Sequence, residues 1–495
     1  MIIDNEQLTK KDSFAFLPLD NRPVSYLLAK QIADFSGIDL LLPERKFLGD
    51  LNKGSDFAYI EKWFMDLINQ TPTMIIALDN WVYGGLVQSR KHNFDLDTLK
   101  SRVNLFVETC HNISPHHIYG FSSIMRIPNY NNSEEEKDYW KDYGEKIFKW
   151  SELMHKVGRG IKEEISHEEL IEKWYESSKV IPPSILADYK GLRDKNLTVN
   201  LLWLESLHNN CFEYLSFSCD DSGKYGMNVI EAEYLKKEIS KHKFDKSTKV
   251  ISGTDEIPLV LLTKAILKKS NLQPSISIYF NSKEGKNQIA KYESNSIYTS
   301  VINQIETLGL EIKDINESDI VLCVHLADSI QGDHIFKEKL NDTSKNVQLI
   351  KKLLEEIKKP FILVDLAYAN GADPKLIETL LSSKINWDKC YSYSAWNTCS
   401  NSTGSALAIG INRWLGEKKK TFNEEAFKKC LFTRFLDDYA YQTQIRHAKV
   451  TEEEINDKMK TYSKTFSKLL GLGGINVKCS LPWKRSFEVE VKVEV

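Results

Sequence analysis

Short apolar segments with the length of buried strands alternate with helical patterns along most of the chain. The segment Phe212–Phe217, for example, is apolar and aromatic, leads into a polar turn that contains Asp220 and Asp221, and precedes a helical pattern. Such alternation is typical of α/β proteins whose sheets are mainly parallel. Further strands are expected at residues 14–19, 39–42, 73–78, 116–122, 249–252, 275–280, 310–313, 320–325, 360–365 and 390–394.

The length of the chain, 495 residues, exceeds what one ordinary hydrophobic core accommodates. The expected strands also outnumber those of a single β/α barrel. We therefore predict an α/β fold with mainly parallel sheets, in which two doubly wound domains face a cleft; a divergent β/α barrel with a helical insertion is the alternative. The expected domains are an N-terminal α/β domain at 1–270 with a helical insertion at about 133–207, a second α/β domain at 271–415, and a helical C-terminal extension at 416–495 that ends in a strand.

The composition excludes several classes of protein. Hydrophobic residues make up 42% of the chain and charged residues 27%, and the formal net charge is -3, so there is no general attraction to nucleic acid or to anionic membranes. The apolar runs are too short for a membrane span, and the N-terminal residues lack the apolar region of a signal peptide. The eight cysteines show no CxxC spacing, and several lie on apolar strands, where a buried thiol is expected. We expect a cytoplasmic protein that binds neither nucleic acid nor membrane.

Polar residues recur where predicted strands end, which is the edge at which α/β sheets bind ligands. Asp and Asn are also common in turns and helix caps, so each residue alone has a structural explanation. The acidic pairs Asp220-Asp221 and Asp255-Glu256 go beyond what capping requires. We therefore expect the strand-end residues to meet around one cavity. The candidate substrate-binding residues are Asp20, Asn21, Arg22, Asp79, Asn80, Arg126, Asp255, Glu256, His325, Asp365, Asn370, Trp396 and Asn397.

Asp220 and Asp221 are the candidate catalytic residues, because like charges in one cleft raise a carboxyl pKa and keep a general acid protonated near neutral pH. In glycoside hydrolysis one carboxyl group protonates the leaving oxygen while a second group acts as base, nucleophile or orienting group. Adjacent acids suit a substrate-assisted variant, in which one acid orients the acetamido group of the substrate. Trp81 or Trp396 could stack on a sugar ring. The sequence thus predicts a hydrolase of a polyhydroxylated small molecule, with a glycoside as the expected substrate.

Two other functions fit the same residues. A metal-dependent hydrolase or lyase would use Asp20, Asp220, Asp255 and His325 as ligands, although no HExxH or HxH pattern is present. A non-enzymatic sugar-binding protein would close two α/β domains on its ligand without chemistry. Neither a dinucleotide-binding nor a P-loop fingerprint occurs, so we expect no cofactor and no dedicated metal site.

Three further features are open to more than one interpretation. His325 lies at the end of an apolar strand, where a site residue and a buried core histidine are both consistent with the pattern. Arg22, Arg90 and Arg126 could bind an anionic group of a substrate or form ion pairs with nearby acids. The charged residues of the predicted insertion are assigned to a solvated face, and its aromatic residues to packing.

Six stretches contain most of these candidates: LPLDNRPVSY (Leu17–Tyr26), ALDNWVYGGLVQSR (Ala77–Arg90), CDDSGKYGMN (Cys219–Asn228), GTDEIPLVLL (Gly253–Leu262), VDLAYANGAD (Val364–Asp373) and AWNTCSNSTGSALA (Ala395–Ala408). In these stretches the sequence resembles a bacterial family known only as domain of unknown function 4127. The resemblance extends from near the N-terminus to about residue 415. It implies that the six stretches belong together, and it implies no activity.

Overall fold

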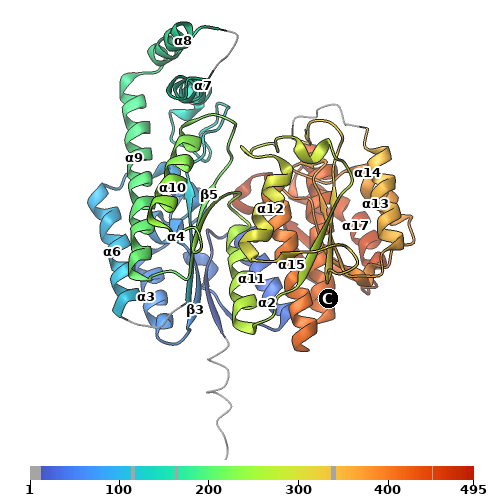
Figure 1. The fold of residues 1–495 in the computed structure, drawn as a ribbon. Coiled ribbons are helices and arrows are strands. Elements are labelled where there is room, and N and C mark those ends of the chain that lie inside the picture. Colours follow the sequence, from blue (N-terminus) through green and yellow to red (C-terminus); the bar gives the residue numbers. More distant parts are fainter. Residues whose placement is uncertain (1–12, 113–116, 162–164, 336–341, 449, 495) are drawn as a thin grey trace, which may run out of the picture. The chain divides into compact units, whose positions relative to one another are not determined.

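The computed structural model describes residues 13–112, 117–161, 165–335, 342–448 and 450–494. These residues form an α/β protein whose two larger sheets are parallel with helices between the strands, as predicted (Figure 1). The chain divides into two compact units. Unit 1 comprises the described residues of Met1–Asn21, Leu41–Thr254 and Tyr292–Ser294, and unit 2 those of Arg22–Leu40, Asp255–Lys291 and Asn295–Val495.

The sheet of unit 1 has six strands. They are β1 (Phe14–Leu17), β2 (Leu40–Leu41), β3 (Thr73–Ala77), β4 (His117–Ile124), β5 (Tyr214–Cys219) and β6 (Thr248–Ser252). Their order is β2-β1-β3-β4-β5-β6. The pairs from β1/β3 to β5/β6 are parallel, so the carboxyl ends of these strands lie at one edge of the sheet. The central strand β3 reads TMIIA and is buried throughout, as expected for a strand whose two faces are both covered.

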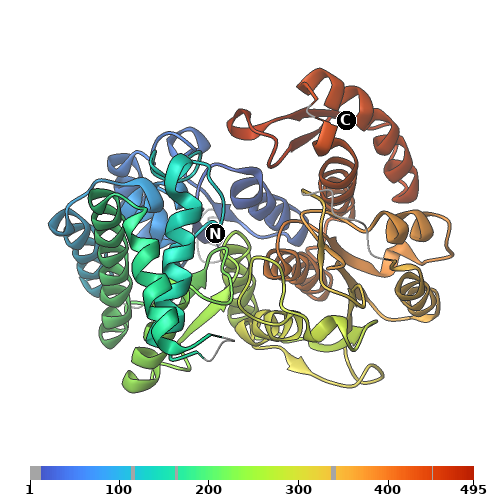
Figure 2. The ribbon, with the colours of Figure 1, turned by 90° about the horizontal axis from the view of Figure 1, so that it is seen from above.

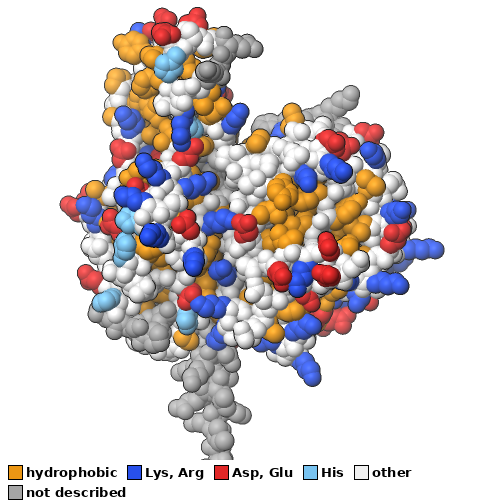
Figure 3. Space-filling model, in the orientation of Figure 1, with side chains coloured by type: hydrophobic (Ala, Val, Ile, Leu, Met, Phe, Trp, Pro, Cys, Tyr) orange, Lys and Arg blue, Asp and Glu red, His pale blue; other side chains and the backbone are white. Residues whose placement is uncertain are grey.

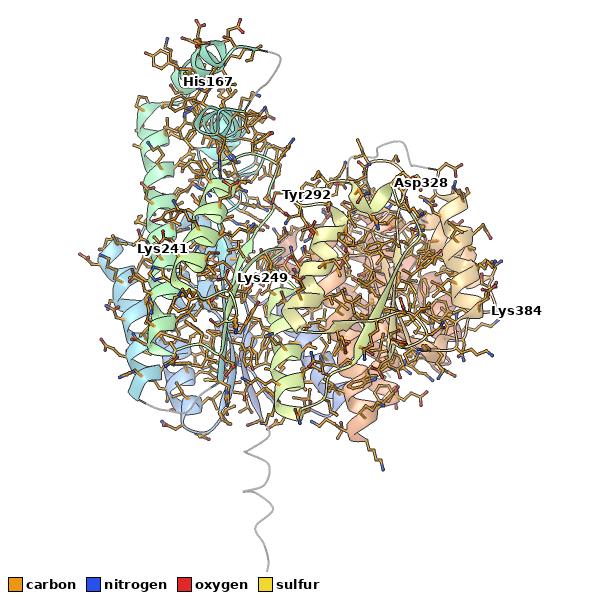
Figure 4. The ribbon with its side chains drawn as sticks, in the orientation of Figure 1. His167, Lys241, Lys249, Tyr292, Asp328 and Lys384 are labelled. Carbon is orange, nitrogen blue, oxygen red and sulfur yellow. The ribbon has the colours of Figure 1, made fainter. Side chains whose placement is uncertain are left out.

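The helices of unit 1 pack beside this sheet and against one another. They are α3 (Phe57–Ile68), α4 (Leu78–Tyr83), α5 (Leu86–Lys91), α6 (Leu96–Asn112), α9 (Pro183–Glu205) and α10 (Met227–His242). α9 contacts both α6 and α10, and α4 contacts β3 and β4. Figure 1 shows α3, α6 and α9 on the same side of the strands. In Figure 4, Lys241 marks the last turn of α10 and Lys249 marks the edge strand β6.

The connection between β4 and β5 carries two further helices besides α9, in the region where the sequence predicts a helical insertion. α7 (Trp140–Gly158) and α8 (His167–Lys179) pack against each other (Figures 1 and 2). A hydrophobic core shared by α7 and α9 contains Trp140, Trp150 and Tyr189 together with Met125 and Ile127. The last two residues directly follow β4. The insertion therefore fixes the chain at the carboxyl end of this strand.

The sheet of unit 2 has five strands. They are β7 (Ser275–Phe280), β8 (Glu311–Ile312), β9 (Ile320–His325), β11 (Phe361–Asp365) and β13 (Cys390–Ser394). All pairs are parallel, and the order is β13-β11-β9-β7-β8. The first strand, β7, therefore lies between the second and the third, as β1 does in unit 1. In such sheets ligands bind at the carboxyl edge beside the first strand, where the strand order reverses.

Helices cover both faces of the unit 2 sheet (Figure 1). They are α2 (Leu28–Ser36), α11 (Ile257–Ser270), α12 (Ile297–Leu308), α13 (Ser344–Glu356), α14 (Pro374–Leu381), α15 (Cys399–Lys419) and α16 (Glu424–Arg434). α15 packs on β11 and β13, and it contacts α2, α11 and α12. Gly410 allows this packing, because a Cβ at that position would lie 2.5 Å from the side chain of Ile362. Helix α2 precedes β2 in the sequence and nevertheless belongs to unit 2.

The remaining elements of unit 2 include two small two-stranded sheets and complete the C-terminal part. A short parallel ladder of β10 (Gly332–Asp333) and β12 (Tyr368–Ala369) follows β9 and β11. After α16 come a π-helix at Phe435–Ile445, α17 (Glu452–Leu469), and an antiparallel pair of β14 (Asn476–Ser480) and β15 (Glu490–Glu494). The alternating C-terminal tail thus pairs with β14. Single helical turns lie at Pro23–Leu27, Arg45–Phe47, Ser206–Asn209, Gly285–Asn287, Trp387–Lys389, Arg446–Ala448 and Pro482–Lys484.

Two general properties follow from these elements. None of the helices in the described ranges is both long and apolar enough to cross a membrane. All eight cysteines are free and buried. Burial raises the pKa of Cys219 and that of Cys390 to about 12, so these side chains remain thiols at neutral pH.

Candidate active site

Three neighbouring strands of unit 1 end in charged residues. Asp79 follows β3, Arg126 follows β4, and Asp220 and Asp221 follow β5. The parallel register of β3, β4 and β5 brings these ends to the same edge of the sheet. Arg90 from α5 and two acidic residues from the loop after β4 join them. We call the group formed by Asp79, Arg90, Arg126, Glu135, Glu136, Asp220 and Asp221 the carboxylate–arginine cluster.

Arg90 is almost fully buried and binds two carboxylates of the cluster. One Nη group donates to Asp220 Oδ2, and the other donates to Glu135 Oε2 at 2.7 Å. The side chain of Asp220 is 9% exposed. Asp220 is therefore a largely buried carboxylate that is paired with a fixed positive charge.

Arg126 binds the second set of carboxylates. Its Nη1 donates to Asp221 Oδ2 at 3.0 Å, and its Nε donates to Glu136 Oε1 at 2.9 Å. Its Nη2 lies 2.8 Å from Glu135 Oε2, the same oxygen that accepts from Arg90. Glu135 thus bridges the two guanidinium groups and holds them at a fixed separation.

Asp221 is the acid of the cluster that solvent reaches most readily. Its side chain is 35% exposed, whereas that of Asp220 is 9% exposed and that of Glu136 is 5% exposed. The loss of water around the carboxyl group and the neighbouring charge of Asp220 raise the pKa of Asp221 to about 6, against the opposing positive charges of Arg126 and Arg90. An accessible carboxylic acid with this pKa can donate a proton near neutral pH.

Asp79 is the fully buried acid of the cluster. Its Oδ2 accepts a hydrogen bond from the backbone N–H of Ser123 at 2.8 Å. Burial, reinforced by the charge of Asp220 and opposed by the bonding from Ser123, raises the pKa of Asp79 to about 7. Because its side chain is closed to solvent, Asp79 can influence a ligand only through the other residues of the cluster.

The cluster holds five carboxyl groups against two guanidinium groups. An excess of acid in a partly buried site favours protonation of some of its members and stabilises positive charge in a ligand. The described residues contain no group of three or more His, Cys, Asp or Glu side chains arranged to hold a metal ion.

The helical insertion positions Arg126 through α9. Arg193 of α9 is buried and forms two hydrogen bonds with the Glu231 carboxylate, at 2.7 and 2.6 Å. Its Nη groups also donate to the carbonyls of Met125 and Arg126, at 2.9 and 3.3 Å. The backbone that carries Arg126 is thereby tied to a buried ion pair.

A second residue of α9 positions Arg90. The Asn196 amide donates to the carbonyl of Ser89 at 2.8 Å, and its Oδ1 lies 2.9 Å from His92 Nε2. Burial lowers the pKa of His92 to about 4, so this ring is neutral and donates to Asn196. These bonds fix Ser89 and His92, the residues that flank Arg90 and Lys91 in the chain.

The other predicted site residues of unit 1 have roles in the loops after β1 and β3. Asp20 is 1% exposed. The backbone N–H of Asn21 donates to the carbonyl of Gly49 at 3.1 Å. The side chain of Asn80 donates to the carbonyl of Pro18 at 2.7 Å, which joins the ends of β1 and β3.

The remaining predicted site residues belong to unit 2. Arg22 and Asp255 form an ion pair at 2.5 Å, and both side chains are less than 10% exposed. Glu256 is fully buried, and its Oε1 accepts a hydrogen bond from Gln304 at 2.7 Å. These acids are thus engaged by partners of their own unit.

His325 and Asp365 lie in a buried network at the carboxyl ends of β9 and β11. His325 Nε2 lies 2.9 Å from Asp373 Oδ2, and Nδ1 lies 2.9 Å from the Asn281 side-chain nitrogen. Both ring nitrogens are therefore occupied. Asp365 accepts a hydrogen bond from the backbone N–H of Asp373 at 2.6 Å, and burial raises its pKa to about 6.

Asn370, Trp396 and Asn397 form the backbone of the turns after β12 and β13. Asn370 and Asn397 have φ values of 58° and 66°, a left-handed conformation that Asn tolerates better than most residues. The N–H of Asn370 donates to the carbonyl of Asn397 at 2.9 Å. Trp396 is 3% exposed, and its carbonyl accepts from Ser402.

The prediction of substrate-binding residues did not include Arg90, Glu135 or Glu136. Arg90 is predicted only as one of three arginines that could bind an anionic group of a substrate or form ion pairs with nearby acids. The two glutamates belong to the acidic run SEEEKDY, which directly follows the segment with Arg126 but begins the predicted insertion. The position of this acidic run shortly after the end of a predicted strand, rather than its charge, is the signal that could have identified its glutamates as site residues.

The fold and the cluster define an α/β protein with two parallel sheets of the same strand order and a carboxylate–arginine site at the edge of one of them. A family model described as a protein of unknown function (DUF4127) matches residues 14–492. The chain belongs to this family, which confirms the resemblance seen in the sequence. No curated protein and no solved structure matches the chain.

Proposed function

We propose that the protein is a hydrolase of a polyhydroxylated small molecule and that its substrate is a glycoside. The observation that carries the proposal is the different environment of two adjacent acids. Asp220 is paired with buried Arg90, whereas Asp221 is accessible and has a pKa raised to about 6. Glycoside hydrolysis needs such a division, with one acid protonated and another group ionised.

In the proposed reaction Asp221 is the general acid. Its proton moves to the glycosidic oxygen, and the bond from this oxygen to the anomeric carbon breaks with its electron pair on the oxygen. A water oxygen then bonds to the anomeric carbon and releases a proton, which restores Asp221. Asp220 orients the substrate group that faces the anomeric carbon, and the net negative charge of the cluster stabilises the oxocarbenium-like transition state.

Asp79 acts through Asp220 in this proposal, because it is fully buried. Burial above all, and then the charge of Asp220, raises the pKa of Asp79 to about 7, so the buried acid carries a proton for part of the time at neutral pH. When Asp79 is protonated it carries no charge, so the Arg90–Asp220 ion pair has no second buried negative charge next to it.

The experiment is to replace Asp220 and Asp221 separately with Asn and to assay a panel of aryl glycosides. We expect Asp221→Asn to lose about 10²- to 10⁴-fold in kcat/KM on substrates with poor leaving groups. The loss should be smaller on substrates with acidic phenol leaving groups, since these need little protonation. Asp457→Asn, at an exposed ion pair with Lys460, is the matched control and should behave as wild type.

Two outcomes would contradict the proposal. Wild-type turnover by both the Asp220 and the Asp221 variants would remove their assigned roles. Saturable binding of a sugar to the wild-type protein without any product would instead favour the non-enzymatic sugar-binding function.

A further inference from the structure

Guanidinium groups and aromatic rings alternate in the C-terminal part of unit 2. The guanidinium carbon of Arg22 lies 5.3 Å from the centre of the Trp483 ring, and that of Arg485 lies 4.5 Å from the same centre. The guanidinium carbons of Arg485 and Arg446 each lie 5.1 Å from the centre of the Phe487 ring. Separations below about 6 Å are those of cation–π contacts. We call these five residues the arginine–aromatic stack.

The three arginines of the stack differ in their acidic partners. Arg22 pairs with Asp255 at 2.5 Å, and Arg485 Nη2 lies 3.4 Å from Glu488 Oε1. Arg446 forms no ion pair with any residue that the structure describes. Its side chain is half-buried. The stack therefore ends in a positive charge that lacks a bound carboxylate.

The Arg446 side chain is held in one orientation by Gln442 and Phe487. Its Nη1 donates to Gln442 Oε1 at 2.8 Å. The Gln442 amide is itself fixed, because its Nε2 donates to Asp437 Oδ1 and to the carbonyl of Phe487, both at 3.2 Å. The Nε and Nη2 atoms of Arg446 form no hydrogen bond within the described ranges. These two donors point in the same direction and form the fork that binds two oxygens of a planar oxyanion.

The stack lies at the carboxyl edge of the unit 2 sheet. Trp396, which follows β13, contacts the Phe487 ring edge to face, with ring centres 6.0 Å apart. The π-helix that precedes Arg446 is tied to the same edge, because Asp438 Oδ2 accepts from the backbone N–H of Ala395 at 2.7 Å. Ligands of parallel α/β sheets bind outside this edge.

The backbone on both sides of the stack is unusual. Arg446 directly follows the π-helix Phe435–Ile445, and a π-helix is rare and often marks a functional site. Trp483 and Lys484 both have a φ of 56°, a left-handed conformation that side chains disfavour. Such backbone persists where the surrounding structure enforces it, commonly at ligand-binding sites.

The surrounding surface provides no general attraction for anions. The formal net charge of the chain is -3. Over the part of unit 2 that faces the viewer in Figure 3, exposed Lys and Arg side chains are interspersed with Asp and Glu. Burial lowers the pKa of Arg446, against the opposing charges of Tyr441, Asp333 and Asp437, as expected for a guanidinium without a bound carboxylate. Binding of an anion at Arg446 would thus be specific to this side chain.

We propose that the arginine–aromatic stack is a binding site for the oxyanion of a small molecule, with Arg446 Nε and Nη2 as the donors to two of its oxygens. Phosphate and carboxylate groups share this chemistry. The inference does not depend on the proposed glycoside hydrolase function, because all the residues of the stack belong to unit 2.

The test titrates the wild-type protein with sodium phosphate and, separately, with sodium malonate, by calorimetry at neutral pH and constant ionic strength. We expect saturable binding of at least one probe at one site per chain, and the tighter probe distinguishes a phosphate from a carboxylate ligand. Arg446→Gln should weaken this binding about tenfold or more, because a charge-assisted pair of hydrogen bonds is lost. Arg446→Lys keeps the charge without the fork and should show a smaller loss.

Arg413→Gln is the matched control. The Arg413 guanidinium carbon also lies close to aromatic rings, 4.2 Å from the centre of Tyr391 and 4.3 Å from that of Phe427, but its Nε pairs with Glu417 at 3.0 Å. This variant should bind the probe as wild type does. Thermal unfolding shows whether each variant is folded, and the probe should raise the Tm of wild type and of Arg413→Gln more than that of Arg446→Gln.

Three results would overturn the inference. The first is a wild-type protein that binds neither phosphate nor malonate saturably. The second is wild-type affinity in Arg446→Gln or, if that variant does not fold, in Arg446→Lys. The third is an equal loss of affinity in Arg446→Gln and Arg413→Gln, which would assign the effect to a general loss of positive charge.

Discussion

The two units share a strand order but differ in what lies at the carboxyl edge of their sheets. In both, the side-chain amide of an Asn residue joins the ends of the first and third strands: Asn80 reaches Pro18 in unit 1, and Asn281 reaches His325 in unit 2. In unit 2 the polar groups then bind one another, since both ring nitrogens of His325 are occupied and Asp365 accepts from Asp373.

Buried polar atoms without a partner occur in both units, and at the corresponding edge of unit 1 some of them lie in the same cluster as an accessible acid. Among the described residues, Asn80 Oδ1 and Arg90 Nε have no hydrogen-bond partner, and the Asp221 carboxyl is accessible. Buried polar groups without partners are uncommon in folded proteins and call for an explanation such as a bound ligand or a catalytic role. The two edges differ in exposure: unit 1 presents the accessible acid Asp221, whereas His325, Asp365 and Asp373 of unit 2 are buried.

The largest expected effect tests the assignment of activity to unit 1. Asp221→Asn should lower kcat/KM on aryl glycosides about 10³-fold and leave the thermal midpoint Tm unchanged. Asp373→Asn, in the buried network of unit 2, should leave kcat/KM per folded molecule unchanged. Steady-state kinetics with active-site titration measures both. Equal losses of kcat/KM in the two variants would contradict the assignment of activity to unit 1.

The second effect concerns stability and belongs to unit 2. Asp373→Ala removes the partner of buried His325 and the cap of α14, whose Lys375 N–H donates to Asp373 Oδ1 at 3.0 Å. We expect a loss of about 3 kcal/mol in the free energy of unfolding. Asp56→Ala removes an exposed cap of α3 and should cost only about 1 kcal/mol in the same urea titration. A similar cost for both would show that the His325 network adds nothing.

The third effect returns to unit 1 and depends on pH. Because the pKa of Asp79 is raised to about 7 in the folded protein, the folded state binds more protons than the unfolded state between about pH 4 and 7. Its contribution to stability is therefore present at low pH and is lost as the pH rises to about 7. Asp79→Asn should stabilise the protein more at pH 8 than at pH 4, by up to about 1.4 kcal/mol for each unit by which the pKa of Asp79 is raised. Thermal unfolding across this range measures the difference, and a pH-independent effect would contradict it.

The smallest effect is the pH dependence of activity. A general acid must be protonated, and the pKa of Asp221 is raised to about 6. We expect kcat/KM of the wild-type protein to fall about tenfold for each pH unit above 6. The Asp221→Asn variant should lack this decline. A decline that persists in the variant would assign the proton to another group.

The sequence predicted strand positions well where burial and pairing coincide. The strands at 275–280, 320–325 and 390–394 have the expected ends. The strand expected at Phe212–Phe217 instead extends over Tyr214–Cys219, because Phe212 packs against the ring of Phe106 and does not take part in the ladder. An apolar residue indicates that its side chain is buried, but not that its backbone pairs with another strand. The observed strand ends therefore differ from the predicted ones where the hydrophobic core extends past the sheet.

The sequence predicted less of the candidate site. It identified Asp79, Arg126, Asp220 and Asp221 as strand-end residues, and these do belong to one cluster. It also predicted His325 and Asp365 as residues of the same site, and these two residues bind Asp373 within unit 2. It also assigned Glu135 and Glu136 to a solvated face, although both bind arginines of the cluster.

The sequence by itself determined that this chain is a parallel α/β protein and that charged residues follow its strands, because hydrophobic periodicity and polar turns are local properties. Only the tertiary structure decided which of these charged residues are buried and paired with a partner and which remain accessible to solvent. Asp220 and Arg90 are 130 positions apart, and His325 and Asp373 are 48 apart. Whether a buried carboxyl group is paired, protonated or exposed depends on such distant partners, and no local pattern specifies them.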